Sequence, residues 1–460
     1  MTILAINWPQ VGLQAAYLIF SLSILVILHE FGHFITAKWF KCRVEKFYLF
    51  FDPWFSLVKK KIGDTVYGIG WLPLGGYVKI SGMVDESMDK EQMKQPPQPW
   101  EFRSKPAWQR LIIMLGGVTM NVLFAFFLYA MILYKWGDTK LPMANVKDGI
   151  WITDSLMYDI GLRNGDKIIA VNGDSIKYFN DLPGKIILGK QITFSRDGKD
   201  QTVTLPPNMI EQLVEKKGKR NTLLMPRVPV IVGAFDSSNK SIGEKAGLHV
   251  FDKIVAIDST PVQFFDQVAP ILNRKKNDSV LLTVIRDQKP VAIRTKVDTS
   301  GKIGFYTLTD VDQLDSLGIF KQETKKYGFL ASFPAGVQKT GKQLDFYIQQ
   351  FKMILNPQTG AYKGLGGFKT MASIFPKTGW DWEAFWNITA FFSIILAFMN
   401  LLPIPALDGG HVLFTLIEMI SGRKPSDKFL EYAQIAGMVI LFALMLFANG
   451  NDWFGWGKGH

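Results

Sequence analysis

The chain has 460 residues, of which 48% are hydrophobic and 20% are charged. Domains usually contain about 100 to 200 residues and soluble proteins about 25% charged residues, so these values exclude a single water-soluble core. The net charge of +12 could indicate a nucleic-acid partner. The basic residues instead follow the pattern of a membrane topology, so we expect no nucleic-acid binding.

Four stretches contain no Asp, Glu, Lys or Arg: residues 12–28, 111–134, 384–407 and 433–449. About 20 apolar residues span a bilayer as a helix, so stretches of this length exclude a purely soluble protein. We therefore predict four transmembrane helices. The single cysteine, Cys42, excludes an intramolecular disulfide, so the regions outside the membrane must be stable without one.

The distribution of basic residues predicts how these helices are oriented. Residues 37–110 contain 13 Lys and Arg, and the short loop 421–432 contains three more, whereas residues 1–28 contain none. Loops rich in Lys and Arg stay in the cytoplasm. With four helices, both termini and the long segment 136–383 are then expected on the outer side of the membrane.

The first apolar stretch ends in a His-Glu-x-x-His pattern formed by His29, Glu30 and His33. On a helix the two histidines share one face, where both imidazoles can bind one zinc ion while the glutamate acts as a base. Charged groups cost about 2.5 to 3.5 kcal/mol each at the centre of a membrane helix, so they indicate a function. Two other interpretations stay open: residues solvated among lipid headgroups, or a metal site without catalysis in a transporter or sensor.

The third apolar stretch runs into a second motif, Asn-Leu-Leu-Pro-Ile-Pro-Ala-Leu-Asp-Gly-Gly-His, from Asn400 to His411. Its two prolines break a helix, and broken backbone at membrane depth is tolerated only against protein or a wet cavity. Asp408 is the natural carboxylate to complete a metal site, and His411 competes with it for that role. A simple helix stop followed by a turn is the alternative.

A glycine-rich segment, residues 67–82, predicts a β-hairpin with its turn at Pro73 and the glycines that follow it. A strand edge near the zinc could form hydrogen bonds with an unwound substrate. The alternative, which is compatible with the first, is an amphipathic hairpin on the inner leaflet. The glycines that would permit a close backbone approach are Gly68, Gly70, Gly75 and Gly76.

The outer segment contains an internal repeat, because residues 161–173 align with residues 247–259. Each copy predicts a turn, a strand and a tight turn into another strand, so we expect two copies of one small β-rich domain. Phe251 and Ser259 stand where the first copy has glycine, and we expect the second turn to differ. The repeat resembles the PDZ domains of bacterial proteases, which implies contact with peptides. The alternative is a pair of steric covers that bind no peptide.

Together these features resemble the bacterial site-2 protease family of the type with two PDZ domains. The resemblance implies zinc bound by His29, His33 and Asp408, with Glu30 as the catalytic base and Asn400 in contact with the substrate. His411 is then a neighbour of the ligands. The glycine-rich segment is similar to the membrane-associated β-hairpin loop of that family.

The expected fold is therefore a helical membrane protein with a membrane-associated β-hairpin and two β-rich PDZ-like domains. The expected divisions follow chain order: 1–136 with two transmembrane helices, 137–220 and 221–310 with one PDZ-like domain each, 311–383 as an outer connection, and 384–460 with the last two transmembrane helices.

The expected function is an intramembrane zinc protease in the bacterial inner membrane, with the PDZ-like domains on its periplasmic side. The resemblance implies single-pass membrane substrates, such as anti-sigma factors or remnant signal peptides. The rival function is a membrane adaptor or metal-handling protein with a structural zinc. A closed site with four protein ligands would favour that rival.

Overall fold

The computed structural model describes residues 7–83, 96–215, 222–236 and 241–457. The chain forms two compact units. The membrane unit, as we call it, consists of Met1–Gly137, Lys326–Pro357 and Ala361–His460. The β unit consists of Asp138–Lys325 and Gln358–Gly360.

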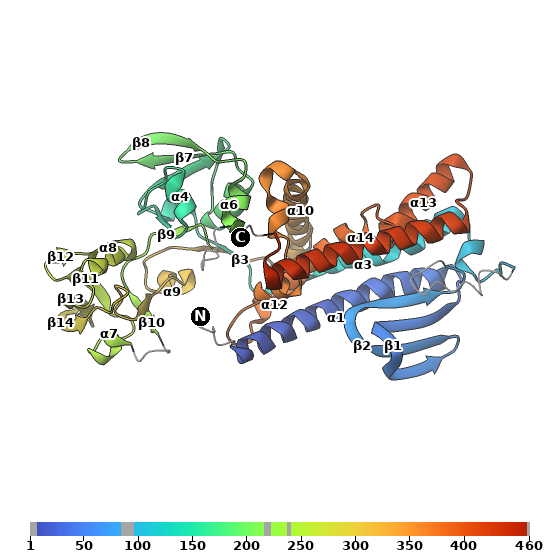
Figure 1. Ribbon diagram of the computed structural model, residues 1–460, viewed down its shortest axis with the longest axis horizontal. Helices are drawn as coiled ribbons and strands as arrows, with labels where there is room; N and C mark the ends of the chain where they lie inside the picture. Colours follow the sequence, from blue (N-terminus) through green and yellow to red (C-terminus); the bar gives the residue numbers. More distant parts are fainter. Residues whose placement is uncertain (1–6, 84–95, 216–221, 237–240, 458–460) are drawn as a thin grey trace. The chain divides into compact units, whose positions relative to one another are not determined.

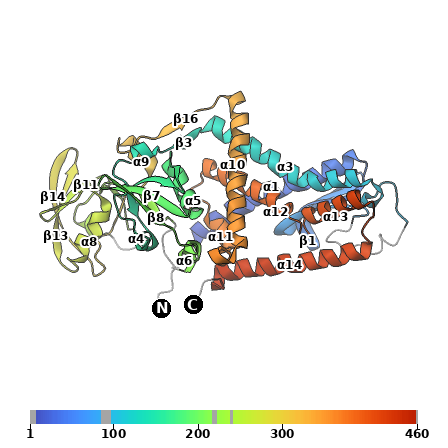
Figure 2. The same cartoon turned by 90° about the horizontal axis from the view of Figure 1, so that it is seen from above.

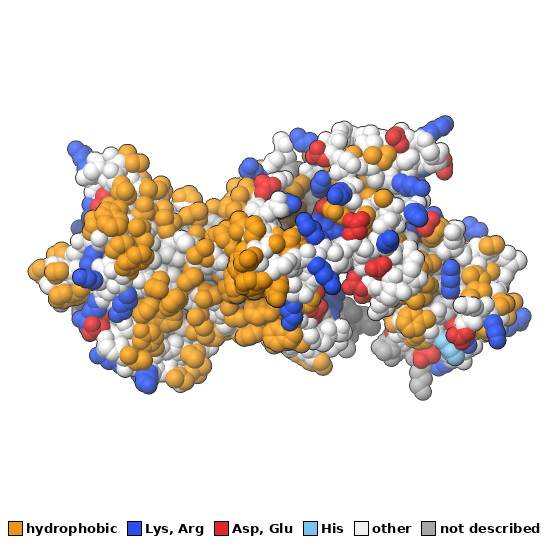
Figure 3. Space-filling view, turned by 180° about the vertical axis from the view of Figure 1, so that it is seen from behind, with side chains coloured by type: hydrophobic (Ala, Val, Ile, Leu, Met, Phe, Trp, Pro, Cys, Tyr) orange, Lys and Arg blue, Asp and Glu red, His pale blue; other side chains and the backbone are white. Residues whose placement is uncertain are grey.

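Among the described residues, four helices of the membrane unit are long and apolar enough to cross a bilayer, as expected. They are α1 (Trp8–Trp39), α3 (Ala107–Lys135), α12 (Trp382–Asn400) and α14 (Asp427–Phe454) (Figure 1). Hydrophobic side chains cover much of the face of this unit that Figure 3 shows. α1 continues well past the end of the uncharged stretch at residue 28, so the His-Glu-x-x-His motif lies inside a continuous helix.

Helix α3 is the centre of the membrane unit, where it packs against α1, α12 and two further helices, α10 (Phe329–Leu355) and α13 (Asp408–Ser421). At the crossing of α1 and α3 the backbones touch. A Cβ added to Gly116 would lie 2.5 Å from the carbonyl oxygen of Gly32, and one added to Gly32 would collide with the carbonyl group of Gly116. Small residues at such a crossing allow the closest approach of two membrane helices.

The third apolar stretch is broken, as its prolines predict. α12 ends at Asn400, residues 401–407 form an irregular loop, and α13 begins at Asp408. The loop is held by α14, because the Ala406 amide donates a hydrogen bond of 3.1 Å to Oε1 of the buried Gln434. Ala406 has a φ of +82°, a conformation that a non-glycine residue adopts only when its surroundings impose it.

The glycine-rich segment lies in a hairpin of two long strands, β1 (Val44–Ile62) and β2 (Thr65–Ile80). The chain reverses around Pro73, as expected, because residues 66–69 run parallel to Lys46–Leu49 whereas residues 76–79 run antiparallel to them. It also reverses at residues 63–64, where Gly63 has a φ of +60°. On either side of the turn around Pro73, Leu72 pairs with Phe51, and Gly76 pairs with Leu49. Lys46 to Leu49 therefore pair on both sides, with residues 66–69 and with residues 76–79.

The β unit contains two four-stranded sheets with the same strand order, β6-β5-β7-β8 and β12-β11-β13-β14 (Figure 2). Both have an irregularity at the same place, between Ile168 and Ala170 in the first and between Ile254 and Ala256 in the second. The sequence repeat is therefore also a structural repeat. The strands are β5 (Lys167–Val171), β6 (Asp174–Ser175), β7 (Gln191–Arg196), β8 (Lys199–Thr204), β11 (Lys253–Ile257), β12 (Thr260–Pro261), β13 (Ser279–Arg286) and β14 (Lys289–Lys296).

Further short strand pairs complete the β unit. β4 (Ile150–Ile152) pairs with β9 (Leu224–Pro226), and β10 (Val232–Phe235) pairs with β15 (Phe305–Thr307). β3 (Asp138–Lys140) pairs with β16 (Glu323–Lys325), so the chain enters and leaves the unit through one antiparallel pair. The helices of this unit are short: α4 (Ser155–Asp159), α5 (Leu182–Ile187), α6 (Met209–Glu215), α7 (Ile242–Lys245), α8 (Val268–Asn273) and α9 (Val311–Ser316).

The two repeats contain the same buried ion pair. The guanidinium group of Arg196 binds both carboxylate oxygens of Asp166, at 2.7 Å each, and Arg286 binds Asp252 in the same way. Both aspartates are 1% exposed. Burial alone would raise the pKa of Asp252, but hydrogen bonds from Arg286 and from the His249 amide keep this pKa below its ordinary value.

The unequal turns of the repeat differ less than we expected. Phe251 keeps the left-handed conformation of its counterpart Gly165, with a φ of +70° against +91°, so the change of residue does not change the backbone there. In the second tight turn Asn172 and Gly173 both have positive φ, whereas in the other copy only Asp258 does. The turn that contains Ser259 thus differs, as predicted. The identity of the two copies as PDZ domains stays a prediction.

Candidate metal centre and catalytic site

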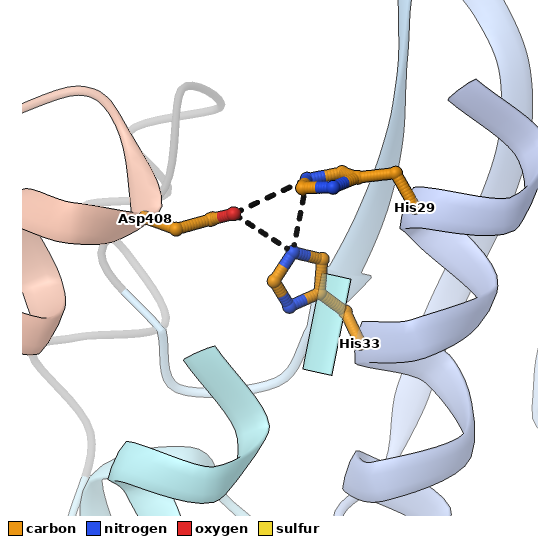
Figure 4. A group of neighbouring side chains, drawn as sticks. All are labelled: His29, His33 and Asp408. Atoms are coloured by element: carbon orange, nitrogen blue, oxygen red, sulfur yellow. Dashed lines mark hydrogen bonds and ion pairs between the residues drawn. The ribbon is translucent and has the colours of Figure 1, made fainter. Parts of the chain in front are cut away.

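Three side chains from two helices of the membrane unit converge on one point (Figure 4). His29 and His33 are one turn apart on α1, and Asp408 is the first residue of α13. Asp408 Oδ2 lies 3.2 Å from Nε2 of each histidine, and the two Nε2 atoms are 3.2 Å apart. These three atoms thus form a nearly equilateral triangle.

The triangle has the dimensions of a zinc site. Ligand atoms about 2.0 to 2.1 Å from a tetrahedral zinc ion lie about 3.3 Å from one another. Asp408 Oδ2 is buried and, apart from the two imidazole nitrogens, has no partner among the described residues. Two imidazole nitrogens and a carboxylate are also the donor types that zinc prefers. The residues present therefore fit zinc.

The space for the two imidazoles is provided by Gly117 on α3. A Cβ at this position would lie 2.6 Å from His29 Cε1 and would collide with Nε2 of His33. Any side chain at position 117 would therefore displace the nitrogen atoms that form the triangle. The close crossing of α1 and α3 and the room for the imidazoles depend on two consecutive glycines, Gly116 and Gly117.

The ring of His33 is oriented by the backbone. Its Nδ1 lies 2.9 Å from the carbonyl oxygen of Ile113 on α3. A carbonyl oxygen only accepts hydrogen bonds, so His33 Nδ1 carries the proton and Nε2 presents its lone pair toward Asp408. The orientation of the His33 ring is thus set by the backbone of the neighbouring helix.

Glu30 opens onto the same cavity, which has a volume of about 590 Å³. The backbone of Val78 on β2 forms a hydrogen bond with the Glu30 carboxyl group. Gly76, two residues earlier, lies close to it as well, since a Cβ there would be 3.3 Å from Glu30 Cγ. The hairpin therefore places one strand beside the glutamate of the motif.

Most of the residues that we singled out in the sequence lie at this site. Asn400 Nδ2 is 3.2 Å from Nε2 of His29. His411 lines the cavity but does not belong to the three-residue cluster. Of the four glycines, only Gly76 lines the cavity; Gly68 packs against the Tyr48 ring, and the other two against Phe51. The roles of all these residues stay predictions.

Several residues that the sequence analysis missed also belong to the site. Gly117 gives room to the imidazoles, Asn121 on α3 contacts His29, and Gln434 holds the loop before Asp408. An asparagine and a glutamine inside uncharged stretches were a usable signal, because polar groups in membrane helices are costly and mark functional positions. The hairpin adds a polar wall in which Tyr77 donates to Asp52, at 2.7 Å.

The fold and site define a class of protein: a membrane protein in which two histidines and an aspartate, in a geometry that fits a metal ion, lie beside a glutamate. Comparison with known proteins agrees with this class. Residues 17–444 match the model of Peptidase family M50. The chain belongs to this family, the site-2 proteases.

Curated relatives are similar along almost their whole length. A protein of Treponema pallidum is 28% identical, with 94% of this chain and 96% of the relative covered. One of Campylobacter jejuni is 28% identical over 98% of this chain and 95% of the relative, and one of Vibrio cholerae is 27% identical over 94% and 97%. All three are named as zinc metalloproteases, and these names indicate zinc as the metal.

The position of Gly117 generates a first prediction. We expect Gly117→Ala to reduce the zinc bound per molecule of purified protein to a small fraction of the wild-type value, because the new methyl group would occupy the space of His33 Nε2. Gly12→Ala is the matched control, since a Cβ at this position of α1 meets nothing within 4 Å. Metal analysis of both variants tests the prediction, and normal zinc content in Gly117→Ala would contradict it.

Proposed function

We propose that this protein is an intramembrane zinc endopeptidase in which His29, His33 and Asp408 bind the zinc ion. The observation that carries the proposal is the triangle of ligand atoms with 3.2 Å sides, next to Glu30 and open to a cavity. Among the described residues the cluster has three protein ligands, which leaves a fourth position of a tetrahedral ion open. An open position favours catalysis over the rival, a structural zinc in an adaptor or metal-handling protein.

In the proposed mechanism zinc supplies a Lewis acid that polarises the peptide carbonyl and makes water acidic enough to attack at neutral pH. Glu30 takes the proton of the attacking water and gives it to the nitrogen of the leaving amine. The amide of Asn400, 3.2 Å from His29 Nε2, is close enough to contact the substrate beside the zinc ligands. The Val78 backbone keeps the carboxyl group of Glu30 at this position.

The hairpin supports a proposal on how the substrate is held. A helical peptide bond is hidden by its own turn, so a substrate helix must unwind before cleavage. Residues 76–80 pair with β1 on one side and line the cavity that contains Glu30. An unwound substrate can add beside these residues as a further strand, with Gly76 permitting close approach near Glu30.

The proposed substrates are single-pass membrane proteins, such as anti-sigma-factor-like proteins, and remnant signal peptides. The proposed location is the inner membrane of a bacterium, with both termini and the β unit on the periplasmic side. The hairpin, with Trp54 91% exposed and Lys59 to Lys61 following it, would contact the inner leaflet. These proposals rest on the family and on the charge pattern of the loops.

The assigned roles predict different losses in two variants. Glu30→Gln removes the base but no ligand, so it should keep its zinc and lose cleavage of a model transmembrane substrate by at least about 100-fold. Asp408→Asn removes a ligand charge and should lose zinc as well as cleavage. Metal analysis and the cleavage assay, made on the same purified samples, separate these cases. Cleavage at the wild-type rate by Glu30→Gln would refute the mechanism.

The orientation can be tested with cysteine labelling. Cys42 is 3% exposed and would not react, so it should be replaced by serine and a cysteine introduced at the exposed Lys60 of the hairpin. A membrane-impermeant thiol reagent should label this cysteine in inverted membranes but not in intact cells. A cysteine at Lys199, exposed on β8, is the reciprocal control and should react from outside. The reverse pattern would overturn the proposed topology.

The pairing of β3 with β16 allows a clean deletion of the β unit. Removing residues 141–322 and joining Lys140 to Glu323, which pair across the sheet, through an Asn-Gly turn keeps this pair intact. If the unit excludes substrates with bulky outer domains, the variant should cleave an untrimmed substrate that the wild type leaves intact. A trimmed substrate should be cleaved at a similar rate by both. Slower cleavage of the trimmed substrate by a zinc-loaded variant would favour peptide binding and refute exclusion.

A further inference from the structure

Asn121 is a fully buried polar residue in the middle of the apolar helix α3. Its side chain is 0% exposed, and its Oδ1 has no hydrogen-bond partner among the described residues. Its Nδ2 lies 3.4 Å from Nδ1 of His29. An unpaired amide oxygen in an apolar helix costs free energy, so its presence beside a zinc-binding residue calls for a reason.

The chemistry of His29 decides which end of the amide must face it. If Nδ2 donates to His29 Nδ1, then the imidazole proton lies on Nε2, the atom that faces Asp408 and His33. A protonated Nε2 has no lone pair for a metal ion. A half-turn of the amide exchanges Oδ1 and Nδ2, so that Oδ1 accepts the hydrogen bond from His29 Nδ1–H and Nε2 presents its lone pair to the metal.

The second histidine shows the same arrangement with a different partner. The Nδ1 of His33 faces the carbonyl oxygen of Ile113, an acceptor that no side-chain substitution removes. His29 instead depends on a side chain, Asn121, for its acceptor. Asn121 itself is held from α12, because Ser393 Oγ donates a hydrogen bond of 2.8 Å to its backbone oxygen.

We propose that Asn121 is a positioning residue for the metal centre, whose Oδ1 accepts the hydrogen bond from His29 Nδ1–H and thereby selects the metal-binding tautomer. This inference rests on the proposed zinc site. Outer partners of this kind typically change metal affinity by about 10- to 100-fold when they are lost. Asn121 contributes through His29 and touches neither substrate nor metal.

The test compares three variants of the full-length protein in detergent, with zinc affinity measured by competition with a chelator. Asn121→Leu keeps the shape of the side chain without an acceptor, and it should raise the zinc dissociation constant by about 10- to 100-fold. Asn121→Asp keeps an acceptor oxygen and should stay within about 3-fold of the wild type. Thr389→Val is the control. It removes the hydroxyl of another fully buried residue, which donates a hydrogen bond to Ser21 away from the site, and it should leave zinc affinity unchanged.

Stability measurements separate positioning from a purely structural role. In the metal-free state Asn121→Leu should unfold close to the wild-type temperature, because it removes a buried amide group together with the hydrogen bond of that group to His29. The rise in Tm on adding zinc should be smaller. If the leucine variant does not fold, Asn121→Ala replaces it in the test. The alanine side chain is smaller and also lacks an acceptor, so this variant should show the same loss of zinc affinity. Wild-type zinc affinity in Asn121→Leu or Asn121→Ala, or an equal loss in Asn121→Asp, would overturn the inference. Failure of the wild type to bind zinc would instead refute the proposed function on which it rests.

Discussion

The contact between the backbones of α1 and α3 is the constraint on which the site depends. It brings the carbonyl of Ile113 to His33 and the side chain of Asn121 to His29, so one helix carries both histidines and the other contacts both rings. Zinc requires its ligand atoms within a few tenths of an ångström of fixed positions. The crossing at Gly32 and Gly116 holds the partners of both imidazole rings at hydrogen-bonding distance, and larger side chains there would push the two helices apart.

The parts of this site that could be predicted from sequence are those set by local spacing. Two histidines four positions apart share a helix face whatever surrounds them, and two prolines break a helix wherever they stand. The residue that completes the cluster was ambiguous from the sequence alone, since Asp408 and His411 are close in the chain. The structure brings Asp408 to the histidines because Gln434, on the last helix, holds the preceding loop.

The other features of the site and of the hairpin could not be predicted from the sequence, because they depend on neighbours that are distant along the chain. Gly117 resembles any small residue of a membrane helix until the imidazoles are placed beside it. The turn around Pro73 could be predicted from its own residues, whereas the pairing of Lys46–Leu49 with residues 66–69 and with residues 76–79 could not, because these partners are distant in sequence.

The strand pair β3 and β16 has a consequence for how this protein can change over time. Residues between Lys140 and Glu323 form an insertion that starts and ends at adjacent points, and α3 and α10, the helices on either side, pack directly against each other. Insertions, losses or duplications within the insertion therefore leave the separation of those helices unaltered. The repeat itself records one such duplication. The membrane unit and the β unit can thus diverge at different rates, with changes in the β unit leaving the geometry around His29, His33 and Asp408 unaltered.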